Sequence, residues 1–235
     1  MKRFLLCVTL FLAGLRLLAQ GTESLPLFCT EPGTHLYYER VKAGNGKLIQ
    51  TTDMDIERIE ETADGSVVHY SVVLRKNGKR EMHGGRVSLT TLVDAANNTH
   101  MDFASSVKSF VQGMFPKSNI KASGTSAILP VDMKPGDSLP DVHAKVEVSI
   151  ISLTVDITGR QVLRKEQITT PAGTFDCIVT RDHKVENVPL HYKDNWVENW
   201  YAPGIGYVQH VTYDENMQTL SVEQLVRIDL FTPGS

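Results

Sequence analysis

Three short turn signals constrain the fold of this 235-residue chain more than any other feature. Asn45-Gly46, Asp64-Gly65 and Asn77-Gly78 are each flanked by strand-like segments. Such pairs favour two-residue turns whose backbone twist matches that of antiparallel strands. Three hairpins in succession predict four consecutive antiparallel strands in the first half of the chain. These strands are expected over residues 35–42, 47–60, 66–75 and 79–93.

The hydrophobic period then changes from that of a strand to that of a helix. Apolar residues recur at helical spacing between Met101 and Phe115, and Pro116 ends the run. The stripe consists of Phe103, Val107, Phe110, Val111 and Met114. Two roles are open for this amphipathic helix: it could line a binding cavity, or it could cover an open face of the sheet. The second role is the commoner one for a stripe of this kind.

Strand patterns resume after residue 141 and continue to residue 230. The apolar face is even-numbered from Val142 to Ile150 and odd-numbered from Leu153 to Ile157, which predicts a bulge or bend within one long strand. Long, consecutive, half-polar strands joined by tight turns are typical of antiparallel sheets. The predicted fold is therefore mainly β: a strongly curved antiparallel sheet, half-barrel or barrel-like, with one short amphipathic helix.

The N-terminus has the layout of a secretory signal peptide. Lys2 and Arg3 precede an apolar run from Phe4 to Leu18, which is too short to span a bilayer. The small residues Ala19 and Gly21 favour cleavage after Gly21. We expect residues 1–21 to be a signal peptide and residues 22–235 to form one β-rich domain, periplasmic or secreted. No later segment is apolar enough to predict a membrane span.

The charge of the expected mature chain argues against a nucleic-acid partner. Residues 22–235 contain 21 basic and 27 acidic residues, a net charge of −6. A nucleic-acid-binding protein would be expected to carry a basic surplus.

Two cysteines, Cys29 and Cys177, follow the expected signal peptide. In an oxidising compartment they could be bridged as a disulfide. Strand alternation places Cys177 on the same face as Phe175 and Val179, which favours a buried thiol or a disulfide over a reactive nucleophile.

Catalytic and metal-binding motifs are missing from the sequence. It contains no nucleophile elbow, phosphate-binding loop, His-Glu-x-x-His motif or paired Cys-x-x-Cys. We therefore predict no catalytic residues, no metal and no cofactor. The alternative is an envelope hydrolase that uses dispersed acidic and histidine residues, with Asp102, His183 and His191 as the candidates.

Aromatic side chains are the remaining candidates for ligand binding. Trp196, Trp200 and Tyr207 lie in the C-terminal strands, and Phe103 and Phe110 lie on the predicted helix. Exposed rings could stack on sugars or hold an apolar ligand, whereas buried rings would form the core of the sheet. The core role is the commoner one for large aromatics in a sheet that has few of them.

Three sequence blocks resemble a known family. They are LTVDITGR (residues 153–160), TTPAGTFDC (residues 169–177) and WYAPGIGYV (residues 200–208). Their order and spacing are similar to those of TapB-like exported bacterial proteins, an uncharacterised DUF3108-like family. The resemblance implies an exported β-rich domain of undefined role, and it carries no catalytic residues over to this chain.

The sequence as a whole favours a non-enzymatic domain. Long strands and one amphipathic helix are expected to form a sheet with a concave face. We therefore expect an apolar or glycan-like ligand, or an envelope partner protein, to bind the curved sheet. A purely structural interaction module is a further alternative, and it predicts an exposed apolar patch or a free edge strand.

Overall fold

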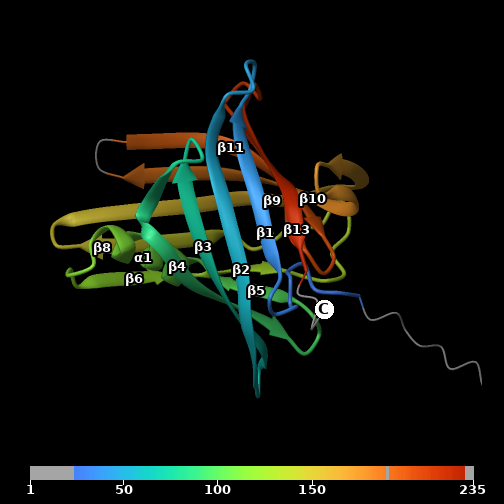
Figure 1. Cartoon of the computed structure of the whole chain (residues 1–235), viewed down its shortest axis with the longest axis horizontal. Helices are drawn as coiled ribbons and strands as arrows, with labels where there is room; N and C mark the ends of the chain where they lie inside the picture. The colour runs from blue at the N-terminus through green and yellow to red at the C-terminus, as the bar shows by residue number, and fades with distance from the viewer. Residues whose placement is uncertain (1–23, 189–190, 231–235) are drawn as a thin grey trace, which may run out of the picture.

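The computed structural model describes residues 24–188 and 191–230, which form one sheet of thirteen strands and one α-helix (Figure 1). All neighbouring strands pair antiparallel, and the sheet curls until it is nearly closed into a barrel. The predicted curved antiparallel fold is thus confirmed. The expected signal peptide, residues 1–21, lies outside the described residues. The helix that the structure describes is too short to cross a bilayer.

The elements follow one another along the chain with few long connections. They are β1 (His35–Lys42), β2 (Leu48–Thr62), β3 (Gly65–Lys76), β4 (Arg80–Asp94), β5 (Thr99–Asp102), α1 (Phe103–Met114), β6 (Ile120–Gly124), β7 (Ser126–Leu129), β8 (Val142–Val148), β9 (Ile151–Thr170), β10 (Gly173–Val188), β11 (His191–Ala202), β12 (Gly206–Tyr213) and β13 (Thr219–Asp229). The four strands predicted from the turn signals correspond to β1–β4.

Turn chemistry accounts for the hairpins of this meander. Asn77 and Gly78 both have positive φ angles, 53° and 69°, as the favoured two-residue hairpin turn requires. At Gly65 a Cβ atom would lie 2.2 Å from the carbonyl oxygen of Val93, so the β2–β3 turn needs a residue without a side chain. Local sequence thereby sets the register of the first four strands.

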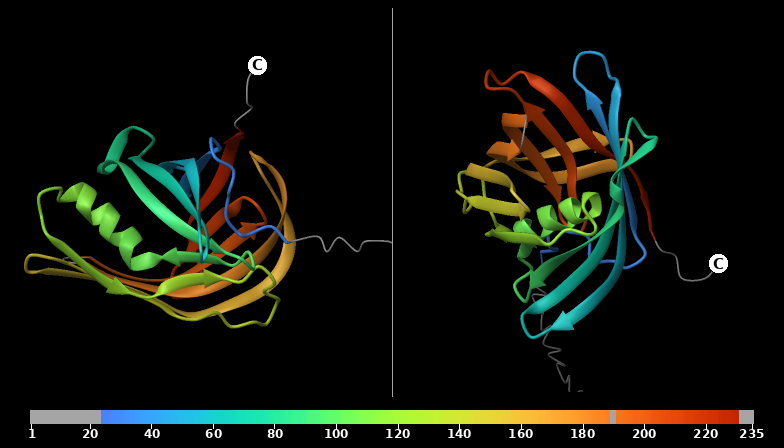
Figure 2. Two further views of the ribbon diagram at one scale, coloured as in Figure 1. Left: turned by 90° about the horizontal axis from the view of Figure 1, so that it is seen from below. Right: turned by 90° about the vertical axis from the view of Figure 1, so that its left-hand side faces the viewer.

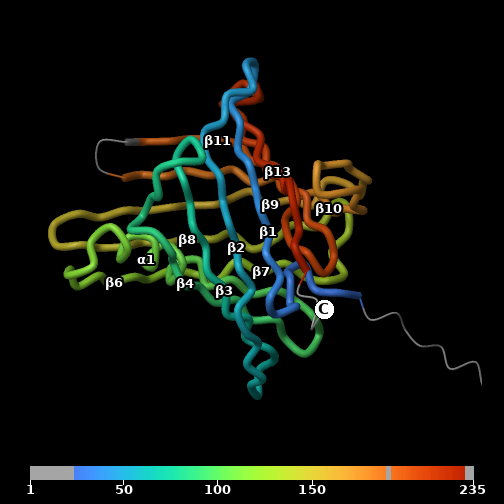
Figure 3. Tube along the Cα trace, in the orientation of Figure 1, coloured from blue at the N-terminus to red at the C-terminus, as the bar shows by residue number. Residues whose placement is uncertain are grey.

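A single bent segment closes the sheet. Within residues 120–129, β6 pairs with β8 at one edge and β7 pairs with β5 at the other edge. Thr125 joins the two halves, and its backbone N–H donates to the carbonyl oxygen of His143 (2.9 Å). Elsewhere the first and last long strands are neighbours, with His35 opposite Asp229 (Figure 3).

The phase change in the second half is a turn and not a bulge. Val148 pairs with Ile151, so β8 and β9 form a hairpin and Ser149 and Ile150 are its loop. Ser149 has a φ of 55°, a left-handed conformation that sequence alone did not signal because no Gly or Asn marks it. The single long strand predicted here was wrong.

Helix α1 lies across the concave side of the sheet and is fixed at both ends (Figure 2). Asp102 caps its N-terminus by accepting the backbone N–H of Ser105 at 2.9 Å. Near its C-terminus, a Cβ at Gly113 would lie 1.8 Å from the carbonyl oxygen of His83 on β4. The backbones of α1 and β4 are therefore in direct contact at this point, which holds α1 in place over the concave side of the sheet.

Because of this contact, we expect Gly113→Ala to change stability in the direction opposite to that expected from helix propensity. Gly113→Ala in an ordinary helix position would stabilise the protein by about 0.5–1 kcal/mol. Here we expect the free energy of unfolding to fall by about 1–3 kcal/mol, because the added methyl group must push the helix off β4. Denaturant unfolding monitored by circular dichroism measures the change. Lys108→Ala, on the exposed face of α1, is the control and should be near neutral; stabilisation by Gly113→Ala would contradict the close approach.

Candidate functional site: an interior cavity beneath α1

A cavity of about 520 Å³, open to solvent, lies between α1 and the inner face of the sheet. Its volume falls in the range of small-molecule sites. The helix contributes five apolar side chains to it: Phe103, Val107, Phe110, Val111 and Met114. Opposite them lie apolar side chains of β2, β3, β4, β9 and β10, including Met54, Val72, Leu89, Leu153 and Val188. The cavity therefore has apolar walls on two sides.

An ion pair lies at one end of this cavity. The guanidinium of Arg40 on β1 donates to Glu223 of β13 through Nη2 (2.6 Å) and Nε (3.2 Å). The hydroxyl of Thr52 donates to the other carboxylate oxygen at 3.0 Å. Glu223 is 4 % exposed, so these donors supply the partners that a buried charge needs.

A second ion cluster connects the cavity with a neighbouring one. Lys184 and Lys193 hold the Glu186 carboxylate at 2.6 Å and 3.1 Å. Burial raises the pKa of Glu186, but the two ammonium groups outweigh it and lower the pKa to about 2. Arg40, Lys184 and Glu186 also line a second cavity of about 620 Å³, which extends to Lys42 and Lys193. The interior thus has an apolar compartment and a charged one with shared walls.

A chain of buried and half-buried polar groups crosses β12, β11, β10 and β9. Nδ1 of His210 lies 2.7 Å from the Asn199 carbonyl, and the Asn199 amide donates to Asp182 at 2.9 Å. Arg160 donates to the same Asp182 carboxylate at 3.3 Å and to the carbonyl of Pro140 at 2.8 Å. We call His210, Asn199, Asp182 and Arg160 the polar chain.

His210 is neutral in the polar chain. Burial, together with the positive charges of Arg40 and Lys184, lowers the pKa of His210 to about 3. The imidazole donates to Asn199 through Nδ1 and accepts from the Thr212 hydroxyl through Nε2 (3.3 Å). One fixed tautomer satisfies both contacts.

His83 lines the apolar cavity with a ring whose Nδ1 atom is buried. Its ring lies edge-on to Phe110, with centroids 5.3 Å apart, and both residues line the cavity. Nδ1 of His83 is buried and has no hydrogen-bond partner among the described residues. Burial also lowers the pKa of this imidazole.

The aromatic residues selected from the sequence fall into two groups. Phe103, Phe110 and Tyr207 all line the apolar cavity. Trp200 is 4 % exposed and donates its indole N–H to Glu166, and Trp196 packs on the His183 ring at 4.8 Å. Asn195 and Val197 face the second cavity, so strand alternation puts Trp196 on the other face of β11. The two tryptophans do not form a platform with the other three rings.

The residues of the hydrolase alternative are not brought together. Asp102 caps α1 and lines a small polar hollow with Ser105, Ser106 and Ser109. Nε2 of His183 is hydrogen-bonded to the Asp194 carboxylate on β11 (2.6 Å), and His183 lines none of the cavities described above. His191 begins β11, and its side chain lies outside the described residues. Within the part of the chain that the structure describes, no group of three or more His, Cys, Asp or Glu side chains is arranged to hold a metal ion.

Both cysteines are free thiols in the same buried cluster. The disulfide that the sequence allowed is thus not formed in the structure. Burial, together with the negative charges of Glu166 and Asp176, raises the pKa of Cys177 to about 12. A thiol of this kind stays protonated at neutral pH and is a poor nucleophile.

Sequence reasoning missed the charged residues of the interior. Arg40, Glu223, Lys184 and Glu186 lie on strands whose inner positions also hold apolar side chains, so they resembled ordinary solvent-facing residues. The signal that could have found them is alternation, since Arg40 follows Leu36 and Tyr38 at intervals of two.

Comparisons with solved structures define the class of protein to which this geometry belongs. Over 88 % of the chain, the fold matches 99 % of a Bacteroides fragilis protein that is inferred to be exported and has a YmcC-like fold, with a TM-score of 0.71 and 19 % identity. An inferred lipoprotein from Parabacteroides distasonis matches with the same TM-score, the same shares of the two chains and 18 % identity. The protein thus has a YmcC-like fold, a curled antiparallel β-sheet with one helix.

The family follows from the sequence model that the chain matches. Residues 31–225 match the DUF3108-like family model, and the chain belongs to this family. The resemblance seen in the three sequence blocks is therefore confirmed. No curated protein sequence matches the chain.

Proposed function

We propose that this protein is an exported, non-enzymatic domain that binds a small apolar or amphiphilic ligand in the cavity beneath α1. The observation that carries the proposal is the composition of this cavity, in which helix and sheet present apolar walls to an interior space of about 520 Å³. Apolar ligand sites have this form, with a few polar groups that fix orientation. The Arg40–Glu223 pair, which lines the cavity, supplies such groups.

An apolar ligand is favoured over a glycan. Sugar binding on a sheet would need exposed aromatic rings, whereas Trp200 is buried and Trp196 packs on His183. The rings that do line the cavity, Phe103 and Phe110, lie among aliphatic side chains. Export is supported by the N-terminal sequence and by the descriptions of the two solved structures as exported protein and lipoprotein.

A substitution on α1 that fills the cavity tests the proposal. Val107→Trp places a large ring in the space beneath α1, and we expect it to weaken binding of the apolar fluorophore N-phenyl-1-naphthylamine at least ten-fold, which is about 1.4 kcal/mol. Lys108→Trp makes the same substitution one residue along, on the exposed face of the helix, and should leave binding unchanged. A fluorescence titration measures both dissociation constants.

Two further measurements keep this test decisive. Circular dichroism of Val107→Trp shows whether the variant is folded, and Leu153→Trp fills the same cavity from β9 if it is not. Native mass spectrometry of protein purified from its own envelope should show a bound lipid-like molecule. Equal affinity of the Val107 and Lys108 variants for the fluorophore, or a co-purifying glycan in place of a lipid, would contradict the proposal.

A further inference from the structure

Exposed apolar side chains surround the end of the apolar cavity. Ile150 at the β8–β9 turn is 99 % exposed, and Met114 and Phe115 at the end of α1 are 46 % and 42 % exposed. Ile151 begins β9 and is also exposed. We call Met114, Phe115, Ile150 and Ile151 the cavity rim. Soluble surfaces carry single exposed apolar residues without consequence, but a cluster beside a cavity marks an interaction site.

The pairing of the strands brings the rim together. Ile120, the first residue of β6, lies opposite Val148, the last residue of β8. The loop that leads from Phe115 into β6 therefore runs beside the Ser149–Ile150 turn, at the same end of the molecule (Figures 1 and 2). Met114 and Leu153, from the two sides of the rim, both line the apolar cavity. The rim and the cavity are thus continuous.

Basic residues flank the rim without matching acidic ones. The segment from residue 103 to residue 131 contains Lys108, Lys117 and Lys121 and no Asp or Glu, although the chain as a whole is acidic. All three lysines are exposed. Glu147, which lies opposite Lys121 in the β6–β8 pairing, is already ion-paired with Lys145 at 2.7 Å. This end of the molecule therefore combines exposed apolar side chains with a local positive charge.

We propose that the cavity rim docks on the surface of a membrane that contains anionic lipid. Peripheral proteins bind such surfaces by inserting apolar side chains below the headgroups while nearby lysines attract the negative surface. Ile150, at a hairpin tip, is placed to insert, and Lys117 and Lys121 lie on the α1–β6 connection and on β6, the strand that pairs with β8. Docking here would bring the apolar cavity to the bilayer, but the inference stands on the surface alone and does not require a ligand in the cavity.

Vesicle co-sedimentation tests the proposal. The protein should bind phosphatidylcholine vesicles that contain phosphatidylglycerol and bind pure phosphatidylcholine vesicles at least five-fold less, because each basic residue near an anionic surface contributes about a five-fold change in partition. Ile150→Asp and Lys117→Glu should each reduce binding at least five-fold. Met217→Asp, at the exposed β12–β13 turn, and Lys47→Glu, at the exposed β1–β2 turn, are the matched controls and should bind as the unaltered protein does.

The outcomes separate this proposal from the ligand proposal. Val107→Trp should lose the fluorophore and keep vesicle binding. Failure of the unaltered protein to bind anionic vesicles, or equal losses in the control variants, would overturn membrane docking whatever the cavity holds. A change of oligomeric state in Ile150→Asp, without vesicle binding by the unaltered protein, would assign the rim to a protein interface instead.

Discussion

Replacing Arg160 by Met should lower the free energy of unfolding by about 3–5 kcal/mol at neutral pH. The Arg160 and Asp182 side chains are 4 % and 7 % exposed, and Asn199 is the other side chain that donates to this carboxylate. Removal of the guanidinium leaves a buried negative charge with one amide donor. Burial already raises the pKa of Asp182. The deficit relative to the unaltered protein should therefore shrink as the pH falls, because a protonated Asp182 no longer needs a cation.

Two companion variants show that the lost charge balance causes this effect. Arg160→Met combined with Asp182→Leu should regain at least half of the lost stability, because the uncompensated charge is removed. Arg164→Met is the control, since the Arg164 side chain is 38 % exposed. Of its two partners, Glu166 is itself 34 % exposed and Glu198 keeps Arg181. We expect it to cost at most about 1 kcal/mol. Equal losses for the Arg160 and Arg164 variants, measured by denaturant unfolding, would contradict the account of the buried pair.

His210 should make the stability of the protein depend on pH well above the range of the carboxylates. Its pKa is about 3 in the folded chain and near 6.5 when unfolded. Below pH 6.5 His210 becomes protonated in the unfolded chain but stays neutral in the folded chain. The contribution of His210 to stability is therefore fully present above about pH 6.5 and is lost as the pH falls towards 3. Between pH 8 and pH 5 this one group should reduce the free energy of unfolding by about 2 kcal/mol.

His210→Asn isolates this contribution. Asparagine keeps a donor towards Asn199 but cannot titrate, so the loss of stability between pH 8 and pH 5 should be about 2 kcal/mol smaller than in the unaltered protein. His143→Asn, on the exposed face of β8, is the comparison variant and should change that difference much less. Urea unfolding at the two pH values measures it. An identical pH dependence in His210→Asn and the unaltered protein would contradict this account, because it would mean that His210 has the same pKa in the folded and unfolded chain.

Local signals predicted the architecture well because local chemistry determines it. The Asn-Gly and Asp-Gly pairs require backbone angles that few other residues accept, so β1–β4 could be placed within a few residues. The apolar residues at helical spacing from Phe103 to Met114 predicted helix α1 equally well. The β8–β9 turn was missed because Ser149 adopts a left-handed conformation without a glycine or asparagine to announce it.

The site could be predicted in part only, because it depends on closure of the sheet. Phe103 and Phe110 were found from their stripe, and both line the cavity. Arg40 and Glu223 lie far apart in the sequence and become an ion pair only when β1 and β13 meet. Trp200 was selected for its size, but its partner Glu166 on β9 takes it out of the cavity. Strand alternation predicts which residues share a face of one strand. It does not predict which faces of distant strands come together in the folded sheet.

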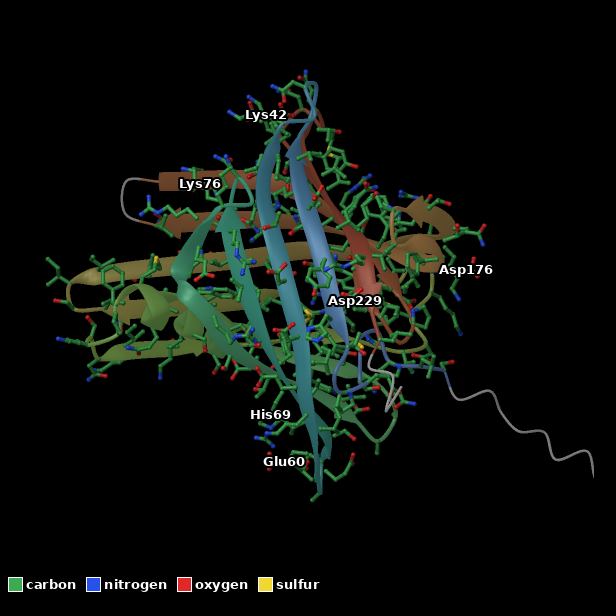
Figure 4. The ribbon with its side chains drawn as sticks, in the orientation of Figure 1. Lys42, Glu60, His69, Lys76, Asp176 and Asp229 are labelled. Atoms are coloured by element: carbon green, nitrogen blue, oxygen red, sulfur yellow. The ribbon has the colours of Figure 1, made fainter. Side chains whose placement is uncertain are left out.

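The pairing of β1 with β13 has a consequence for folding. β1 can form a hairpin with β2 as soon as both are synthesised, but its other edge stays open until residues 219–229 are available (Figure 4 marks Lys42 and Asp229 near the C-terminal ends of these two strands). Contacts between such distant parts of a chain form slowly because the loop between them must be ordered first. The Arg40–Glu223 pair belongs to this last step, so the barrel interior is completed only after the chain is synthesised through β13. A nascent chain that ends before β13 therefore has neither the complete sheet nor the Glu223 side of the cavity.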